Sequence, residues 1–190
     1  MPPILRDRPS TRTGAAWFSI IPFRYLKPEW PLIEQHTQVA NETTVFRTLH
    51  HVCIVVSDIN AAAAFYESVG IGPWVDYPSL TQYTELEVPN VESFLTTTYK
   101  YTNLENIQIQ LCQPGKGASP QRQFLETHGE GVFHLGFSVP DCDGAESTAQ
   151  SLGLEVLMKG RRNDGTGFSY FNTANRGAAV TLEVRSSPKS

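Results

Sequence analysis

Two stretches of the chain show the same succession of hydrophobic and polar positions. Residues 52–56 and 135–139 are short runs rich in branched and aromatic residues, which predict β-strands. Each run is followed by an aspartate, Asp58 or Asp141, where a helix N-cap belongs, and then by apolar residues at helical spacing. Gly70 and Gly153 mark the expected ends of the two helices. The pattern therefore predicts a strand followed by a helix, twice.

The two stretches superpose with an offset of 83 residues. HVCIVVSDINAAAAFYESVGI, which begins at His51, and HLGFSVPDCDGAESTAQSLGL, which begins at His134, share six identities in 21 positions without a gap. More strands are predicted after each helix, over 93–101 and 106–113 in the first half and over 155–161, 167–173 and 178–185 in the second. The chain is thus predicted to contain a duplicated module of one strand, one helix and two or three further strands.

The repeat divides the chain into four parts. Residues 48–115 form the first module, 116–130 a linker with a short helix, and 131–190 the second module. Residues 1–47 form an N-terminal extension that is rich in proline and lacks sustained periodicity. A secretory signal is not expected there, because Pro22 breaks the apolar patch AAWFSIIPF and no small-residue cleavage site follows it. A mitochondrial presequence stays open as an alternative to a cytoplasmic location.

Composition narrows the class of protein. The chain has 190 residues, 40% of them hydrophobic and 18% charged, with a formal net charge of −4, which is typical of a globular protein. We expect no nucleic-acid partner, because no basic stripe is present to neutralise phosphates. We also expect no membrane span, since no apolar run approaches about 18 residues. The three cysteines are far apart and form no CxxC pair, so we expect buried thiols and no disulfide framework.

Strand alternation places four polar residues on equivalent faces. His51 and His134 open the two repeats and lie opposite the large apolar residues that should cover each helix. Gln110 and Glu183 lie on the polar faces of the strands that close the two modules, and they align with each other. If the sheets of the two modules curl together, all four side chains can converge on one cavity.

Two imidazoles, one amide oxygen and one carboxylate form a mixed nitrogen and oxygen ligand set. Such a set suits a divalent first-row ion such as Co²⁺, Mn²⁺, Ni²⁺, Zn²⁺ or Fe²⁺. Four protein ligands on a six-coordinate ion would leave two adjacent positions for substrate oxygens, which the ion would polarise. Taken singly, each residue also has an ordinary structural interpretation as a hydrogen-bonded or solvated strand residue. Their occurrence at duplicate positions favours the metal site.

These residues resemble the vicinal-oxygen-chelate superfamily, the glyoxalase, bleomycin-resistance and extradiol-dioxygenase group. The resemblance covers about residues 48–186 and is carried by LHHVCIVVSDINAAAAFYESVGIGPW, NIQIQLCQP, FHLGFSVPD and SYFNTANRGAAVTLEV. Within the group, GIGPW and the order His51, Gln110, His134, Glu183 are most similar to methylmalonyl-CoA epimerase and its relatives. Glyoxalase I usually carries a glutamate where Gln110 stands, and extradiol dioxygenases use only the positions of the other three.

The resemblance implies an α+β fold in which two βαβββ modules pair into an open, cup-shaped mixed sheet around a divalent metal ion. It implies a homodimer and a small-molecule substrate, for which an acyl-CoA is a candidate. It also implies an isomerase or epimerase in which the ion chelates two substrate oxygens and stabilises an enolate after a base removes the adjacent proton. Glu183 is one candidate catalytic residue. The second glutamate of the epimerase pattern falls near Glu92, which is a candidate base without a secure match.

Other residues are candidates for the substrate pocket, and other functions stay open. A CoA ester favours basic residues at the rim of the cup, and the candidates are Lys116, Arg122, Arg161, Arg162 and Arg176. An apolar substrate favours aromatic residues inside the cup, and the candidates are Trp74, Tyr77, Tyr83, Phe94, Tyr99, Phe168 and Tyr170. The alternative functions are a non-heme Fe(II) extradiol-type dioxygenase, a protein that sequesters a small molecule, and a glyoxalase-like lyase.

Overall fold

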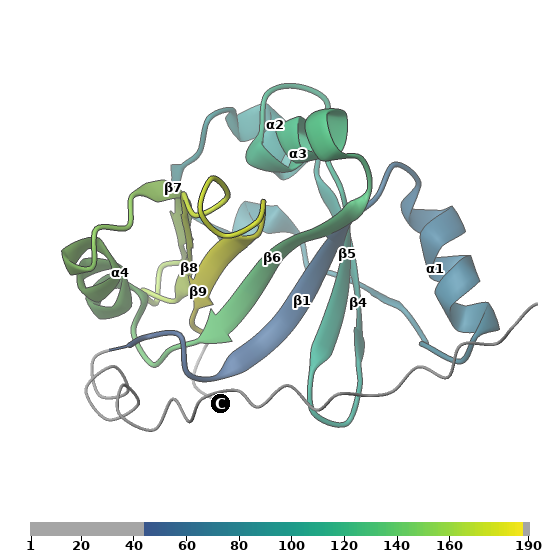
Figure 1. The fold of residues 1–190 in the computed structure, drawn as a ribbon, viewed down its shortest axis with the longest axis horizontal. Coiled ribbons are helices and arrows are strands. Elements are labelled where there is room, and N and C mark those ends of the chain that lie inside the picture. Colours follow the sequence, from purple (N-terminus) through teal and green to yellow (C-terminus); the bar gives the residue numbers. More distant parts are fainter. Residues whose placement is uncertain (1–43, 188–190) are drawn as a thin grey trace, which may run out of the picture. The chain divides into compact units, whose positions relative to one another are not determined.

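The computed structural model describes residues 44–187, so most of the predicted N-terminal extension (1–43) and residues 188–190 lie outside the described part. The described residues form an α+β fold (Figure 1). The strands are β1 (Leu49–Val55), β2 (Val75–Asp76), β3 (Glu85–Glu87), β4 (Thr98–Asn103), β5 (Gln108–Gln113), β6 (Gly131–Ser138), β7 (Val156–Arg161), β8 (Gly167–Phe171) and β9 (Thr181–Arg185). The helices are α1 (Ile59–Ser68), α2 (Val91–Leu95), α3 (Pro120–His128), α4 (Cys142–Ser151) and the 3₁₀ turn η1 (Leu80–Gln82).

The nine strands form one open mixed sheet in the order β2-β4-β5-β1-β6-β9-β8-β7-β3. The two halves meet where β1 pairs antiparallel with β6, the two strands that open the repeats. Each opening strand also pairs in parallel with the strand that closes its own half, β1 with β5 and β6 with β9. The predicted α+β fold and its mixed sheet are thereby confirmed. One strand departs from the modular plan, because β3 of the first half pairs with β7 at the far edge of the second.

The repeated helices begin and end where the sequence predicts. The side chain of Asp58 accepts hydrogen bonds from the first turn of α1, and Asp141 does the same for α4. Gly70 and Gly153 follow the two helices with φ of +90° and +82°, a left-handed conformation that glycine adopts without the steric cost of a Cβ atom. Helix α3 lies in the predicted linker. In Figure 1, α1 and α4 lie toward opposite ends of the sheet.

The strand predicted over 93–101 is wrong in its first part. Asn90 caps α2 through a hydrogen bond from the backbone N–H of Ser93 to its side-chain oxygen, at 2.7 Å. Strand β4 begins only at Thr98. The Thr-rich segment favours a strand by propensity alone, but the asparagine cap and the buried Phe94 favour one helical turn.

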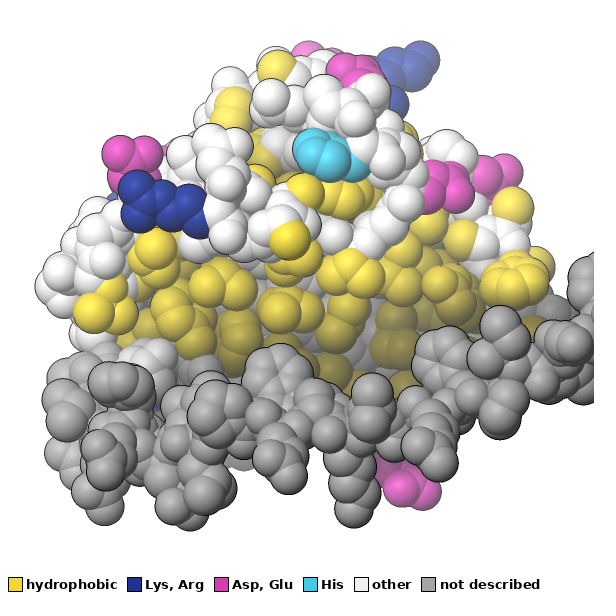
Figure 2. All heavy atoms as spheres, in the orientation of Figure 1, with side chains coloured by type: hydrophobic (Ala, Val, Ile, Leu, Met, Phe, Trp, Pro, Cys, Tyr) yellow, Lys and Arg dark blue, Asp and Glu magenta, His cyan; other side chains and the backbone are white. Residues whose placement is uncertain are grey.

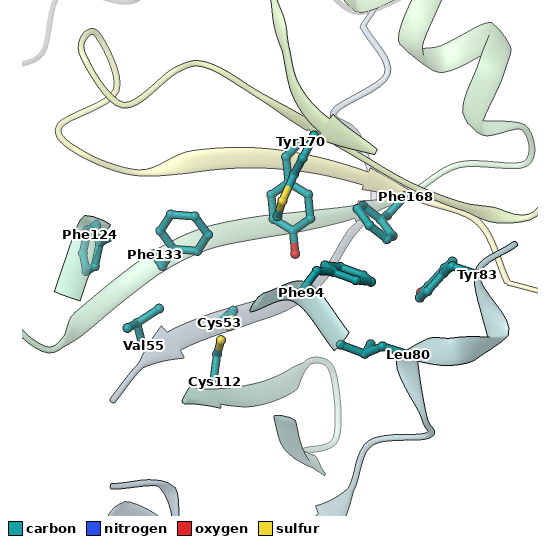
Figure 3. Packing of buried hydrophobic residues seen from close by; sticks show 11 residues of the cluster. Cys53, Val55, Leu80, Tyr83, Phe94, Cys112, Phe124, Phe133, Phe168 and Tyr170 are labelled. Atoms are coloured by element: carbon teal, nitrogen blue, oxygen red, sulfur yellow. The ribbon is translucent and has the colours of Figure 1, made fainter. Parts of the chain in front are cut away.

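The two faces of the sheet carry different clusters. On one face, Ile54 and Leu111 pack against α1, and Val184 and Leu182 pack against α4. On the other face, Cys53, Cys112 and Val55 join Leu80 of η1 and aromatic residues from the end of η1, α2, α3, β6 and β8 (Figure 3). The three cysteines are buried and free, as the sequence predicts. The two faces of β1 and β5 thus separate as strand alternation requires.

Apolar side chains also gather across the middle of the face shown in Figure 2. The exposed large hydrophobic residues include Leu49 and Val132, which are each 40% exposed. None of the helices within residues 44–187 is long and apolar enough to cross a membrane.

Candidate metal centre and its cavity

Three of the four predicted ligands converge at the centre of the sheet. His51 Nε2 lies 2.8 Å from His134 Nε2, and Glu183 Oε2 lies 3.0 Å and 2.9 Å from these two nitrogens. His51, His134 and Glu183 are all buried. They come from β1, β6 and β9, so the contact between the two halves of the chain assembles the centre.

Two β-bulges aim the histidines. Between Leu49 and His51 the pairing advances two residues in β1 but only one in β6, which leaves His50 as the extra residue. Close to His134 the pairing advances two residues in β6 but one in β1, which leaves Phe133 as the extra residue. His50 and Phe133 are related by the repeat offset, so each half of the chain has a bulge directly before its histidine. Bulges commonly redirect side chains beside active sites, and these two serve the same purpose.

The residues of the bulges contact the histidines that follow them. His50 Nδ1 lies 2.9 Å from His51 Nδ1, and the ring of Phe133 packs edge-on against His134 at 5.5 Å between centroids. A hydrogen bond between the two Nδ1 atoms leaves His51 Nε2 facing the centre. Such a contact to the outer nitrogen of a histidine fixes the orientation and tautomer of a metal-binding imidazole.

Gly136 makes room for His51. The two residues are paired across β1 and β6, and a Cβ atom on Gly136 would lie 2.0 Å from His51 Cε1. That distance is far shorter than any ordinary contact, so only glycine allows this imidazole position.

The strand register makes Gln110 and Glu183 structural equivalents. Gln110 pairs with Cys53, and Glu183 pairs with Gly136, which occupies the position of Cys53 in the repeat. Gln110 is buried and lines the same cavity as His51 and Glu183. Its Nε2 donates to Gln108 Oε1 at 2.7 Å, which holds the amide in the cavity wall.

The charges at the centre suit a cation. Burial is the main effect on His51 and lowers its pKa, so its imidazole is neutral at neutral pH and has a lone pair available. The centre thus combines a buried carboxylate with nitrogen ligands, and no lysine or arginine of residues 44–187 forms an ion pair with that carboxylate.

Two observations test whether an ion fits these residues. Among the described residues, Glu183 Oε2 makes no hydrogen bond of acceptable geometry, although both Nε2 atoms lie within 3.0 Å of it. Glu183 Oε2 is therefore a buried acceptor without a hydrogen-bond donor, as expected of an atom that binds an ion. Ligands about 2.1 Å from an ion and at right angles lie about 3.0 Å apart, close to the spacing found here. A divalent ion would therefore fit with His51 Nε2, His134 Nε2 and Glu183 Oε2 at three adjacent positions of an octahedral site.

The centre opens into a cavity of about 360 Å³, a volume that includes its mouth. It is lined by His51, Tyr77, Leu80, Tyr83, Phe94, Tyr99, Gln110, Phe168, Tyr170, Glu183 and Arg185. Tyr170 Oη lies 3.4 Å from His134 Nε2, and Figure 3 shows its ring beside Phe94 and Phe168. The cavity combines a polar floor with aromatic walls, a common composition for small-molecule sites.

Six of the seven predicted aromatic candidates line this cavity. The exception is Trp74, which packs with Tyr66 beside α1. Glu92 is not among the lining residues and is exposed on α2, so the structure does not bring the candidate base to the centre. Glu183 is the one carboxylate that the described residues place in the cavity wall.

The five basic residues predicted for the rim do not gather at the mouth of the cavity. Arg161 is held by Asp143 and Glu146, and Arg122 donates to the backbone carbonyls of Pro114 and Gly115. Lys116 and Arg176 are exposed away from the cavity. Arg162 alone of the five lies near its mouth, where it contacts Tyr83.

Sequence reasoning missed two residues near the centre. Arg185 shares a strand face with Glu183 and lines the cavity, a position that alternation along β9 could have revealed. His50 contacts His51, and although the repeat offset selects His51 as the counterpart of His134, the supporting position of His50 follows only from the bulge.

Comparison with known proteins agrees with this geometry. Residues 50–171 match the family model of the glyoxalase/bleomycin resistance protein/dioxygenase superfamily. The chain belongs to this superfamily. It is also 31% identical over 113 residues to the ethylmalonyl-CoA/methylmalonyl-CoA epimerase of Cereibacter sphaeroides, an alignment that spans 59% of this chain and 75% of the relative.

Solved structures of superfamily members share the fold. Methylmalonyl-CoA epimerase from Mycobacterium tuberculosis aligns with a TM-score of 0.56 and 20% identity, covering 77% of this chain and 92% of that one. A Streptomyces coelicolor methylmalonyl-CoA epimerase in complex with 2-nitronate-propionyl-CoA aligns with a TM-score of 0.55 and 21% identity, covering 76% and 99%. The resemblance to epimerases predicted from the motifs is confirmed.

Proposed function

We propose that this chain is a divalent-metal-dependent isomerase or epimerase that moves a proton on the carbon next to a carbonyl group. The observation that carries the proposal is the convergence of His51 Nε2, His134 Nε2 and Glu183 Oε2 within 3.0 Å of one another in a cavity that Gln110 also lines. These four residues would hold the ion, with Gln110 as the ligand equivalent to Glu183. The ion, when bound, supplies Lewis acidity toward substrate oxygens.

The protein groups that can carry a proton lie in the cavity wall. Glu183 is a carboxylate at the centre, and we assign it the dual role of ligand and proton carrier. Burial raises the pKa of Tyr170 well above its usual value, with the charge of Glu183 adding to the effect. The Tyr170 hydroxyl therefore stays protonated and can donate a hydrogen bond to a substrate oxygen that gains negative charge. The aromatic walls limit access of water to the reacting carbon.

We further propose a thioester, such as an acyl-CoA, as the substrate class to test before other carbonyl compounds. The support is the similarity to the Cereibacter sphaeroides ethylmalonyl-CoA/methylmalonyl-CoA epimerase. Because the structure does not bring Glu92 to the cavity, a second carboxylate base is not part of the proposal. A homodimer and a cytoplasmic location stay predictions.

The deciding experiment is proton exchange in D₂O. Full-length protein loaded with Co²⁺, Mn²⁺, Ni²⁺ or Zn²⁺ is incubated with a panel of 2-substituted acyl-CoA and free carbonyl compounds, and NMR follows loss of the α-proton signal. We expect exchange that requires added metal and disappears in His134→Ala and Glu183→Ala. Exchange that survives both substitutions would refute the assignment.

A non-heme Fe(II) ring-cleaving dioxygenase is the second candidate. The observation in its favour is that two histidines and one glutamate form the converging set, which is the ligand set of that enzyme class. Oxygen uptake with a catechol, dependent on Fe²⁺ and unaffected by Gln110→Ala, would establish this function in place of the first.

A further inference from the structure

Two arginines lie at a second groove that adjoins the metal cavity. The groove is lined by Arg162 and Arg185 together with His50, Tyr77, Pro78, Gln82, Tyr101, Asn103, Gln108 and Ser187. Tyr77 and Arg185 line both the groove and the metal cavity, so the two spaces share a wall. The groove wall contains no aspartate or glutamate within the described residues.

Neither arginine has an ion-pair partner within 4.0 Å in the described part of the chain, although five other basic or imidazole side chains do. Arg185 donates one hydrogen bond, from its Nη2 to Tyr77 Oη at 3.2 Å. Arg162 donates to Tyr83 Oη at 3.0 Å and to Thr166 Oγ1 at 3.3 Å. A guanidinium has five N–H donors, so most of the donors of this pair are left for a ligand.

The Nε atoms give a second and independent observation. In both Arg162 and Arg185 the Nε atom is buried and has no acceptor among the described residues. A buried N–H donor without a partner is costly, and the cost falls when an acceptor binds. Arg161 makes the contrast, because its Nε donates to Asp143 at 2.9 Å and its Nη2 to Glu146 at 2.9 Å.

We propose that Arg162 and Arg185 form a subsite for an anionic oxygen group, a carboxylate or a phosphate, on the substrate of the neighbouring metal centre. A planar guanidinium fork fits such groups because two parallel N–H donors match two oxygens. The tyrosine hydroxyls at Tyr77 and Tyr83 hold the two guanidiniums in place. The assignment to the substrate rests on the proposed function, whereas the anion site itself rests on the groove.

The position of the subsite limits the substrate. Arg185 follows Glu183 by two residues on the same face of β9, a spacing of about 7 Å along a strand. Arg185 lines the metal cavity as well as the groove, whereas Arg162 lines the groove beyond it. The subsite thus suits carbonyl compounds that carry an anionic group beyond the reacting carbon.

Binding of small anions to the full-length protein tests the subsite. The probes are succinate, inorganic phosphate and adenosine 3′,5′-bisphosphate, titrated by calorimetry into the protein as purified and after loading with Co²⁺. The variants are Arg185→Gln and Arg162→Gln, and Arg176→Gln is the control because it removes the same charge at an exposed position outside both cavities. Thermal unfolding reports whether each variant is folded. If Arg185→Gln is not folded, the anion affinity of Arg162→Gln decides the test.

We expect at least one probe to bind with or without Co²⁺. Arg185→Gln and Arg162→Gln should each weaken the affinity for that probe by about 10-fold or more, because each removes a charge-assisted hydrogen bond. Preference for succinate would identify a carboxylate, and preference for the bisphosphate would identify a phosphorylated substrate. Absence of binding by all three, binding only with Co²⁺, or equal weakening by Arg176→Gln would overturn the inference. Anion binding that persists while D₂O exchange fails would refute the proposed reaction and leave the subsite intact.

Discussion

Replacing Gly136 by alanine should remove the metal site while leaving the fold in place. The added Cβ would lie 2.0 Å from Cε1, 2.4 Å from Nδ1 and 2.6 Å from Nε2 of His51. The shortest ordinary contact of a Cβ atom is 3.4 Å, so the imidazole must move by at least about 1.4 Å. His51 is only 1% exposed, and little space surrounds it.

A displacement of that size is large compared with the centre itself. His51 Nε2 lies 2.8 Å from His134 Nε2 and 3.0 Å from Glu183 Oε2, so a shift of this order takes it out of the ligand set. Loss of a supporting contact alone typically lowers metal affinity by about 10- to 100-fold, and displacement of a ligand costs more. We therefore expect Gly136→Ala to weaken Co²⁺ binding by at least about 100-fold. Overpacking should cost about 1–3 kcal/mol of stability, which a folded domain tolerates.

The measurement is competition for Co²⁺ with a chromophoric chelator, together with thermal unfolding of the apoprotein. Gly131→Ala is the matched control, because it adds the same methyl group to the same strand where the nearest atom, of Phe124, is 3.9 Å away. We expect the control to bind Co²⁺ like the parent protein. If Gly136→Ala also binds Co²⁺ with the parent affinity, the close contact does not position His51 and the reasoning is wrong.

Three further substitutions test other parts of the structure. Glu92→Gln should change neither Co²⁺ affinity nor the rate of D₂O exchange by more than about twofold, since Glu92 is exposed outside the cavity. A large loss of exchange would show that Glu92 takes part in the reaction. Glu146 is buried, and although burial opposes its ionisation, hydrogen bonds from neighbours that include Lys159 lower its pKa. Glu146→Gln should therefore cost about 2–4 kcal/mol at pH 7, because it leaves Arg161 without this partner. The ionised carboxylate stabilises the fold above its unfolded pKa, so the difference between parent and variant in urea unfolding should shrink as the pH falls below about 4.5. A difference that is constant with pH would exclude a charge effect. Asp141→Ala should cost about 1 kcal/mol by removing the N-cap of α4, measured by the same unfolding; no change would mean that the cap is redundant.

Local periodicity explains why much of the site could be predicted. The two aspartate caps and the glycines at 70 and 153 act within one turn of a helix, and strand alternation depends only on the nearest neighbours in the chain. His51, His134 and Glu183 could therefore be assigned to inward faces before any strand pairing was known. Their duplicate positions made convergence a reasonable prediction, and the structure brings the three side chains together.

Long-range pairing decides what local patterns do not contain. The extra residues His50 and Phe133 exist as bulges only relative to the opposite strand, so no pattern within β1 or β6 reveals them. Strand β3 joins the far edge of the sheet for the same reason. The aligned epimerase pattern pointed to Glu92, but Asn90 starts a short helix there, and the carboxylate lies on its exposed side.

The sequence by itself determined the repeated strand and helix, the boundaries of α1 and α4, and the faces that carry the candidate metal ligands, because each depends on interactions between residues close in the chain. Only the tertiary structure decided how the ligands are aimed and what surrounds them. The close contact between Gly136 and His51, the aromatic walls, and the two arginines that have no ion-pair partner within residues 44–187 each involve residues from different strands or turns. Such contacts form when the two halves of the sheet pair, and their geometry is set by register and packing across the whole domain.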